Sequence, residues 1–105
     1  MGNPETPIMN RIMARLSEHG CFVLRTNSGV YYTPNGDRIR IGFPGLSDMV
    51  GCTEDGTFFA IEVKVPGKKP RENQKAFLEM VKRHGGLAGI ATSPEEAIEI
   101  VSKQR

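Results

Sequence analysis

The sequence contains no tryptophan, only two cysteines and only two histidines among its 105 residues. Cys21 and Cys52 each lie inside an apolar, strand-like run, which predicts reduced core residues of an intracellular protein rather than a disulfide or a reactive thiol. His19 and His84 have no cysteine or acid at metal-ligand spacing, so we interpret them as packing or helix-end residues. These scarcities disfavour both a zinc site and a disulfide scaffold.

Long apolar runs are also missing. No stretch approaches the length of a membrane span, and the segment after Met1 lacks the apolar core of a signal peptide, so we expect a cytoplasmic protein without membrane partners. A chain of 105 residues with 38% hydrophobic and 25% charged residues predicts one domain, spanning 1–105, with one modest core. The net charge of +2 permits nucleic-acid binding but does not indicate it.

The stretch 58–65 carries the most information. β-branched and aromatic residues dominate it, and no breaker interrupts it before Pro66, which predicts a strand. Because side chains alternate along a strand, Glu62 and Lys64 share one face, opposite a wholly apolar face. Buried charges are costly unless they are paired or bind a metal. Taken alone, the two residues are most simply an ion pair on a half-solvated edge.

The preceding segment supplies a second acid. Residues 46–52 form a short apolar run that contains Asp48, and an Asp-Gly turn signal separates this run from the strand at 58–65. If 54–56 is a three-residue hairpin loop, Thr53 pairs with Thr57 and Asp48 lies opposite Glu62, with Cβ atoms roughly 4.5–5.5 Å apart. Like charges so placed need a cation between them, and a divalent ion with oxygen ligands meets that need.

An acid followed by Glu-x-Lys on the next strand resembles the PD-(D/E)xK nuclease superfamily. The wider order of motifs, from about residue 5 to residue 97, resembles the stand-alone, phage-type virus-type replication–repair nuclease (VRR-Nuc) domain. Ser47 departs from the superfamily pattern, because it replaces the proline before the acid at its most variable position. The segments that carry the resemblance are Arg25–Gly29, Gly45–Asp48, Glu62–Lys64, Gln74–Phe77 and Gly85–Gly86.

The resemblance implies a fold and an activity. The expected fold is α/β, a restriction-endonuclease-like mixed sheet flanked by helices in the order α-β-β-β-α-β-α. The expected activity is structure-selective DNA endonuclease cleavage with Mg²⁺ or Mn²⁺, similar to Holliday-junction resolvases that act as homodimers on branched DNA. A phage-encoded protein would act in the host cytoplasm. Asp48 and Glu62 would ligate the metal, with the Val63 carbonyl as a third oxygen.

Other residues match supporting positions of the family. The resemblance implies that Glu5 and Gln74 support the metal site, and that Arg25 and Asn27 position the substrate at its edge. The plain alternatives are a surface acid at a helix start for Glu5 and a glutamine bonded to nearby backbone for Gln74. The Thr6-Pro7 pair predicts a helix that begins after Glu5, which would leave Glu5 in a mobile arm.

Two further segments predict contacts with DNA. Residues 30–33 and 38–41 flank an Asn-Gly turn and interleave Tyr31 and Tyr32 with Arg38 and Arg40, which suits stacking and phosphate contact as well as it suits a solvated hairpin. The loop 66–71 follows the strand at 58–65 directly and carries cations that favour phosphate binding. These cations are Lys68, Lys69 and Arg71.

The remaining pattern predicts the second half of the fold. A helix from about residue 70 to residue 84 should bury Gln74, Phe77, Met80, Val81 and His84. The strand 87–92 should lie parallel to that at 57–65, joined by a right-handed crossover through this helix. A Ser-Pro-Glu-Glu start predicts a last helix after residue 93.

The role of Lys64 stays open between general base, water positioning and charge stabilisation. Two neighbouring carboxylates favour its charged form, so we expect charge stabilisation and water positioning. Two alternative functions remain: a non-catalytic nucleic-acid-binding or assembly module that keeps the fold, and an unrelated structural domain with a chance Glu-x-Lys.

Overall fold

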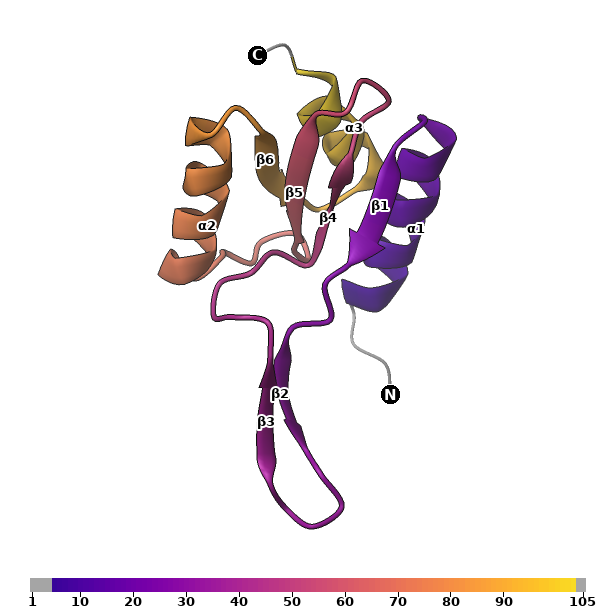
Figure 1. Cartoon of the computed structure of the whole chain (residues 1–105). Helices are drawn as coiled ribbons and strands as arrows, with labels where there is room; N and C mark the ends of the chain where they lie inside the picture. Colours follow the sequence, from indigo (N-terminus) through magenta and orange to yellow (C-terminus); the bar gives the residue numbers. More distant parts are fainter. Residues whose placement is uncertain (1–4, 104–105) are drawn as a thin grey trace.

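The computed structural model describes residues 5–103. In chain order the elements are α1 (Glu5–Glu18), β1 (Phe22–Arg25), β2 (Gly29–Tyr32), β3 (Arg38–Ile41), β4 (Met49–Cys52), β5 (Phe58–Val63), α2 (Glu72–Arg83), β6 (Leu87–Ala91) and α3 (Pro94–Ser102) (Figure 1). Without the β2–β3 hairpin this order is α-β-β-β-α-β-α. The predicted α/β class and element order are therefore confirmed.

Four strands form the central sheet in the order β1-β4-β5-β6. β4 and β5 pair antiparallel with Met49 opposite Ile61, and the Thr53 N–H donates to the Thr57 carbonyl at 2.9 Å. This is the register that a three-residue loop predicts. β5 and β6 pair parallel through α2, also as predicted. The mixed sheet places the ends of β5 and β6 at one edge, beside the start of β4.

Helices cover the two faces of this sheet unequally. α1 and α3 lie on one face, where buried side chains such as Ile12, Met49 and Phe59 form the larger apolar cluster. α2 lies on the other face and packs against β5 and β6, so that Ala60, Leu78, Val81 and Ala88 form a smaller cluster. Strand β5 is consequently buried on both sides from Phe59 to Val63.

Two helix predictions need correction. α1 includes Glu5, so this residue stands on a helix and not in an arm, and Thr6 is not the cap. In α2 the buried residues are Gln74, Leu78 and Val81, whereas Met80 and His84 are exposed. The inward stripe runs through Leu78, which the sequence pattern left out, while Phe77 is only half-buried, so the buried face of α2 is rotated relative to the predicted face.

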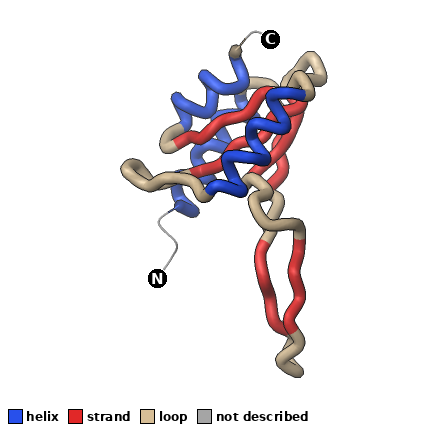
Figure 2. Tube along the Cα trace, turned by 90° about the vertical axis from the view of Figure 1, so that its left-hand side faces the viewer, coloured by secondary structure: helices blue, strands red, loops and turns tan. Residues whose placement is uncertain are grey.

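The β2–β3 hairpin projects away from the sheet (Figures 1 and 2) and gives the molecule its longest extent, 47 Å against 31 and 26 Å. Its strands pair with Tyr32 opposite Arg38 and Val30 opposite Arg40, so these four side chains share one face. Tyr31 and Ile39 pair on the other face. Over residues 5–103, no helix is long and apolar enough to cross a membrane.

Candidate active site

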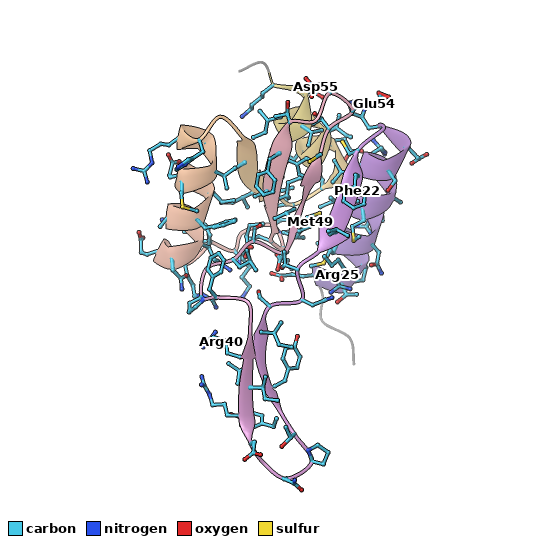
Figure 3. The ribbon with its side chains drawn as sticks, in the orientation of Figure 1. Phe22, Arg25, Arg40, Met49, Glu54 and Asp55 are labelled. Atoms are coloured by element: carbon cyan, nitrogen blue, oxygen red, sulfur yellow. The ribbon has the colours of Figure 1, made fainter. Side chains whose placement is uncertain are left out.

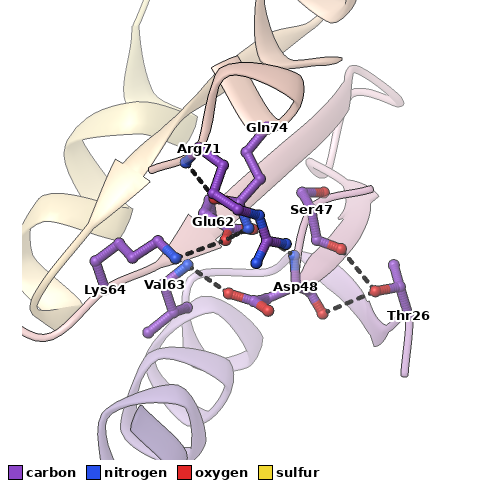
Figure 4. Close-up of polar contacts among 8 residues, drawn as sticks. All are labelled: Thr26, Ser47, Asp48, Glu62, Val63, Lys64, Arg71 and Gln74. Carbon is purple, nitrogen blue, oxygen red and sulfur yellow. Dashed lines mark hydrogen bonds and ion pairs between the residues drawn. The ribbon is translucent and has the colours of Figure 1, made fainter. Parts of the chain in front are cut away.

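A buried glutamate lies at the end of the central strand. Glu62 is the fifth residue of β5, and only 1% of it is exposed. Its Oε1 accepts a hydrogen bond from the Asp48 N–H at 3.2 Å, and its Oε2 accepts one from the Gln74 side-chain amide. Its Oε2 also lies 3.3 Å from the Lys64 Nζ (Figure 4). Every oxygen of this carboxyl is therefore held by a donor from a different segment.

Asp48 stands directly before β4, across the hairpin from Glu62. Its Oδ2 accepts a hydrogen bond from the Val63 N–H at 2.8 Å. Thr26, which follows β1, holds this segment in place, because its Oγ1 donates to the Ser47 carbonyl at 2.6 Å and its N–H donates to the Asp48 carbonyl at 3.1 Å. Three strand ends thus fix the backbone that carries the acid.

The carboxyl of Glu62 has an altered acidity. Its pKa is raised from 4.5 to about 7, chiefly because burial disfavours the charged form and secondly because Asp48 lies beside it. Lys64 acts in the opposite direction, through its charge and its hydrogen bond. The site is therefore short of positive charge when both acids are ionised.

Gln74 links the start of α2 to the acids. It is buried at the third position of the helix, and its Oε1 accepts a hydrogen bond from the Arg71 N–H at 2.9 Å. Its amide nitrogen donates to Glu62. Gln74 therefore makes both contacts that the sequence offered as alternatives, a hydrogen bond to nearby backbone and a hydrogen bond to Glu62. In Figure 4 the Arg71 guanidinium points toward the two acids.

A small pocket opens beside Asp48. It has a volume of about 160 Å³, and the residues that line it with Asp48 include Glu5, Arg25, Asn27 and Tyr31. The Tyr31 hydroxyl donates to the Asn27 carbonyl at 3.1 Å, and Asn27 adopts a φ of 52°, which is unusual for a residue other than glycine. The structure therefore brings Glu5, Arg25 and Asn27 to Asp48.

The remaining predicted residues lie outside this pocket. Arg38 and Arg40 are exposed on the hairpin, which leaves the body at the end of the sheet where Arg25 lies (Figure 3). Lys68 and Lys69 are exposed in the loop between β5 and α2. Both ends of this loop contact the site, at Lys64 and at Arg71.

Sequence reasoning assigned no role to Thr26 or to Ser47. The buried Ser47 hydroxyl donates to the Met49 carbonyl at 3.0 Å and so shapes the turn into β4. The signal was present for both residues, because Thr26 stands between the two motif residues Arg25 and Asn27, and Ser47 directly precedes the acid.

The carboxylate set is small. Among residues 5–103, no group of three or more histidine, cysteine, aspartate or glutamate side chains is placed to hold a metal ion. Asp48 and Glu62 are in direct contact through the Asp48 backbone N–H, and Glu5 lines the same pocket as Asp48. Beyond these two carboxylates, the backbone, water and a substrate phosphate are further sources of oxygen ligands.

Comparison with known proteins identifies the family of the chain. The sequence model of the VRR-NUC domain family matches residues 35–95, more than half of the chain. The chain belongs to the VRR-NUC family. A solved structure titled "VRR_NUC domain" superposes with a TM-score of 0.71 at 18% identity, covering 99% of this chain and 100% of that one. No curated protein matched the chain.

Membership of the VRR-NUC family supports a nuclease role, because VRR-NUC domains are nucleases that generally depend on a divalent metal. The likeness to the solved structure confirms the restriction-endonuclease-like fold of the VRR-NUC domain over the whole chain. In this fold, Asp48, Glu62 and Lys64 meet at one edge of the sheet.

Proposed function

We propose that the chain acts as one domain and is a Mg²⁺- or Mn²⁺-dependent endodeoxyribonuclease that cuts branched DNA, such as a four-way junction, as a homodimer in the cytoplasm. The observation that carries the proposal is the cluster of Asp48, Glu62 and Lys64 at one sheet edge of a VRR-NUC domain. Two buried or half-buried acids beside a lysine are costly to place together without a chemical use.

The donor set fits a hard divalent cation. Asp48 and Glu62 offer carboxylate oxygens, which suit Mg²⁺ and Mn²⁺. The N–H and C=O of one strand residue project to the same side, so the Val63 carbonyl faces the same side as the N–H that binds Asp48. The raised pKa of Glu62 also favours a cation, because a positive charge would offset the repulsion from Asp48. A bound ion would supply polarisation of the scissile phosphate and a more acidic water.

The remaining groups hold this chemistry in place. Lys64 lies 3.3 Å from Glu62, at a position from which its ammonium neutralises charge that develops on the phosphate and orients the attacking water. Gln74 fixes the rotamer of Glu62 from behind. Glu5, Arg25 and Asn27 line the pocket beside Asp48, and we assign Glu5 to support of the metal site and Arg25 and Asn27 to positioning of the substrate at its edge.

The proposed DNA contacts surround this edge. Arg38 and Arg40 share a face of the hairpin with Tyr32, which combines phosphate contact with a stacking surface. Lys68, Lys69 and Arg71 add positive charge on the loop between β5 and α2. A chain of 105 residues offers little surface for reading base sequence, so recognition of DNA shape is physically reasonable.

Cleavage of a labelled synthetic four-way junction tests the proposal. The junction is compared with linear duplex and single-stranded DNA, in the presence of Mg²⁺, Mn²⁺ or EDTA. We expect metal-dependent, paired, symmetric nicks on the junction. Asp48→Asn and Glu62→Gln should abolish the nicks but preserve DNA binding, whereas Glu79→Gln, at an exposed ion pair of α2, is the matched control and should cut normally.

Two outcomes would overturn the proposal. Binding of the junction without cutting under either metal would identify a non-catalytic DNA-binding or assembly module instead. Cutting that Glu62→Gln leaves unchanged would place the chemistry elsewhere on the molecule. The homodimer is tested separately, because a concentration-independent monomer mass in sedimentation, with and without DNA, would exclude paired cutting by a stable pair of subunits.

A further inference from the structure

Half of one sheet face is uncovered. α2 packs against β5 and β6, and Val50 of β4 reaches its apolar cluster, whereas within residues 5–103 no helix covers this face of β1. In Figure 1 no helix is drawn in front of β4 and β1, and α2 lies to the left of the strands. In Figure 3 the Phe22 side chain stands on the uncovered side of β1.

The uncovered face is apolar and continuous. Phe22 pairs with Cys52, which pairs with Phe58, and in the next row on this face Leu24 pairs with Val50. Directly paired residues project to the same side of a sheet, so the two rows form one surface. Phe22 is 63% exposed, Leu24 50% and Phe58 43%. This is unusual for core-type side chains on strands of a small domain.

The flank of α2 extends this surface. A hollow of about 300 Å³ between the helix and the sheet is lined by Phe58, Phe77, Met80, Val81 and His84. Met80 is 41% exposed at its rim. We use the name "open face" for the surface formed by Phe22, Leu24, Val50, Cys52, Phe58, Phe77 and Met80.

We infer that a second copy of this chain covers the open face. The seven residues include no lysine or arginine, so the surface does not suit a phosphate backbone. Taking roughly 200 Å² for a fully exposed large apolar side chain, the four most exposed members offer about 400 Å² together. A contiguous apolar patch of this size equals the largest patch found on typical monomers, roughly 300–600 Å², and such patches often serve as interaction sites.

The area also suits a symmetric dimer. Homodimer interfaces are about 65% apolar, so an apolar core of about 400 Å² corresponds to about 600 Å² per subunit and about 1,200 Å² in total. That total is the lower bound of specific interfaces, before the half-buried Val50, Cys52 and Phe77 are added. A net charge of only +2 per chain gives little repulsion between two copies.

The shape of the face selects the symmetry axis. On one side of the open face α2 stands above the sheet, and on the other side lies β1, which no helix covers on this face (Figure 1). A two-fold axis parallel to the strands places α2 of each subunit over β1 of the other subunit. A two-fold axis perpendicular to the strands, in the plane of the sheet, would place α2 against α2 and keep the two β1 strands apart. The parallel axis keeps both hairpins and both candidate active sites at the same end of the dimer.

This inference rests on the proposed function in one respect: the open face would be the surface that joins the two subunits of the proposed homodimeric nuclease. The test is sedimentation velocity over a range of concentrations without DNA. We expect wild type to be a dimer and Leu24→Lys to raise the dissociation constant at least about 100-fold, since both copies place the charge in the interface. Ile39→Lys on the hairpin, at a similar exposure of 45%, is the matched control and should remain dimeric.

Met80→Lys provides an independent variant on a different element, in case Leu24→Lys fails to fold as judged by circular dichroism. Wild type that stays monomeric at all concentrations, or a folded Leu24→Lys and Met80→Lys that both stay dimeric, would refute the open face as the dimer surface. A copurifying protein bound to a monomer, and released by Leu24→Lys, would also refute it and assign the face to that partner.

The two proposals can fail separately. Disruption by Leu24→Lys of a dimer that never cuts DNA would support the interface and reject the nuclease. Metal-dependent cutting by a protein that is monomeric throughout would support the metal-dependent nuclease and reject both the interface and the homodimer. If both hold, Leu24→Lys should convert paired cuts of the junction into single nicks at unchanged metal dependence, while Glu62→Gln should remain dimeric and inactive.

Discussion

The buried carboxyl of Glu62 makes the stability of the protein depend on pH in a defined direction. Its pKa is about 7 in the folded protein, because of burial first and of Asp48 second, against 4.5 in the absence of these effects. The folded chain therefore keeps a proton between about pH 4.5 and 7 that the unfolded chain releases. The resulting stabilisation is fully present below about pH 4.5 and is lost as the pH rises to about 7.

The size of the effect follows from the same values. At about 1.36 kcal/mol per pKa unit, the difference between 4.5 and about 7 corresponds to about 3 kcal/mol. The free energy of unfolding of wild type should fall by this amount, through Glu62, between about pH 4.5 and about pH 8. Glu62→Gln carries no titrating group at this position, so its unfolding free energy should lack this component.

Urea unfolding followed by circular dichroism measures the effect. Both proteins are unfolded at about pH 5, 6, 7 and 8 in EDTA, and the difference between them is plotted against pH, which removes the contribution of all other titrating groups. Mg²⁺ at about pH 8 should then raise the unfolding free energy of wild type much more than that of Glu62→Gln. A difference that does not change between pH 5 and pH 8 would show that Glu62 titrates normally and would refute the reasoning.

Three further perturbations have expected results. Gln74→Leu removes both hydrogen bonds of the glutamine and should lower single-turnover cleavage about 10- to 100-fold at saturating DNA, whereas an unchanged rate would show that Glu62 needs no brace. Arg40→Ala should weaken junction binding and reduce the slope of log K against log salt by about 1, and an unchanged slope would remove Arg40 from the DNA surface. Gly45→Ala places a Cβ 2.5 Å from the Asn73 carbonyl oxygen at a φ of +91°, so it should lower the urea midpoint, and an unaltered midpoint would mean that the Asp48 loop shifts freely.

The pairing of Asp48 with Glu62 could be predicted because it depends on local rules. A three-residue turn fixes the register of an antiparallel hairpin, and a one-residue change would have moved Asp48 to the other face. The structure has the predicted register, with Met49 opposite Ile61. Gln74 stands three residues before Phe77, which predicts an inward position, and Gln74 is buried, although Phe77 itself is only half-buried and Leu78 is buried in addition to Val81.

The misplaced residues depend on long-range packing that local patterns do not contain. In the sequence, Met80 and His84 continue the apolar face of α2. In the structure, α2 contacts β5 and β6 with its other side, and Met80 and His84 are exposed. Glu5 precedes a Thr-Pro pair that is typical of a helix start, yet the helix includes it. The direction of the hairpin and the exposure of Phe22 and Leu24 likewise follow from how whole elements pack, so the sequence could not predict them.

The two hydrogen bonds of Gln74 join helix formation to the integrity of the acidic cluster. The side-chain oxygen of Gln74 accepts the hydrogen bond from the Arg71 N–H at the first turn of α2, and its side-chain nitrogen donates to Glu62. Because one amide group makes both hydrogen bonds, both are lost when that turn opens. Helix ends are the parts of a protein that unfold locally at the lowest free energy. Amide hydrogen exchange at the start of α2 would therefore report the fraction of folded molecules whose site is transiently disassembled, and a ligand that binds the acids should slow that exchange without touching the helix.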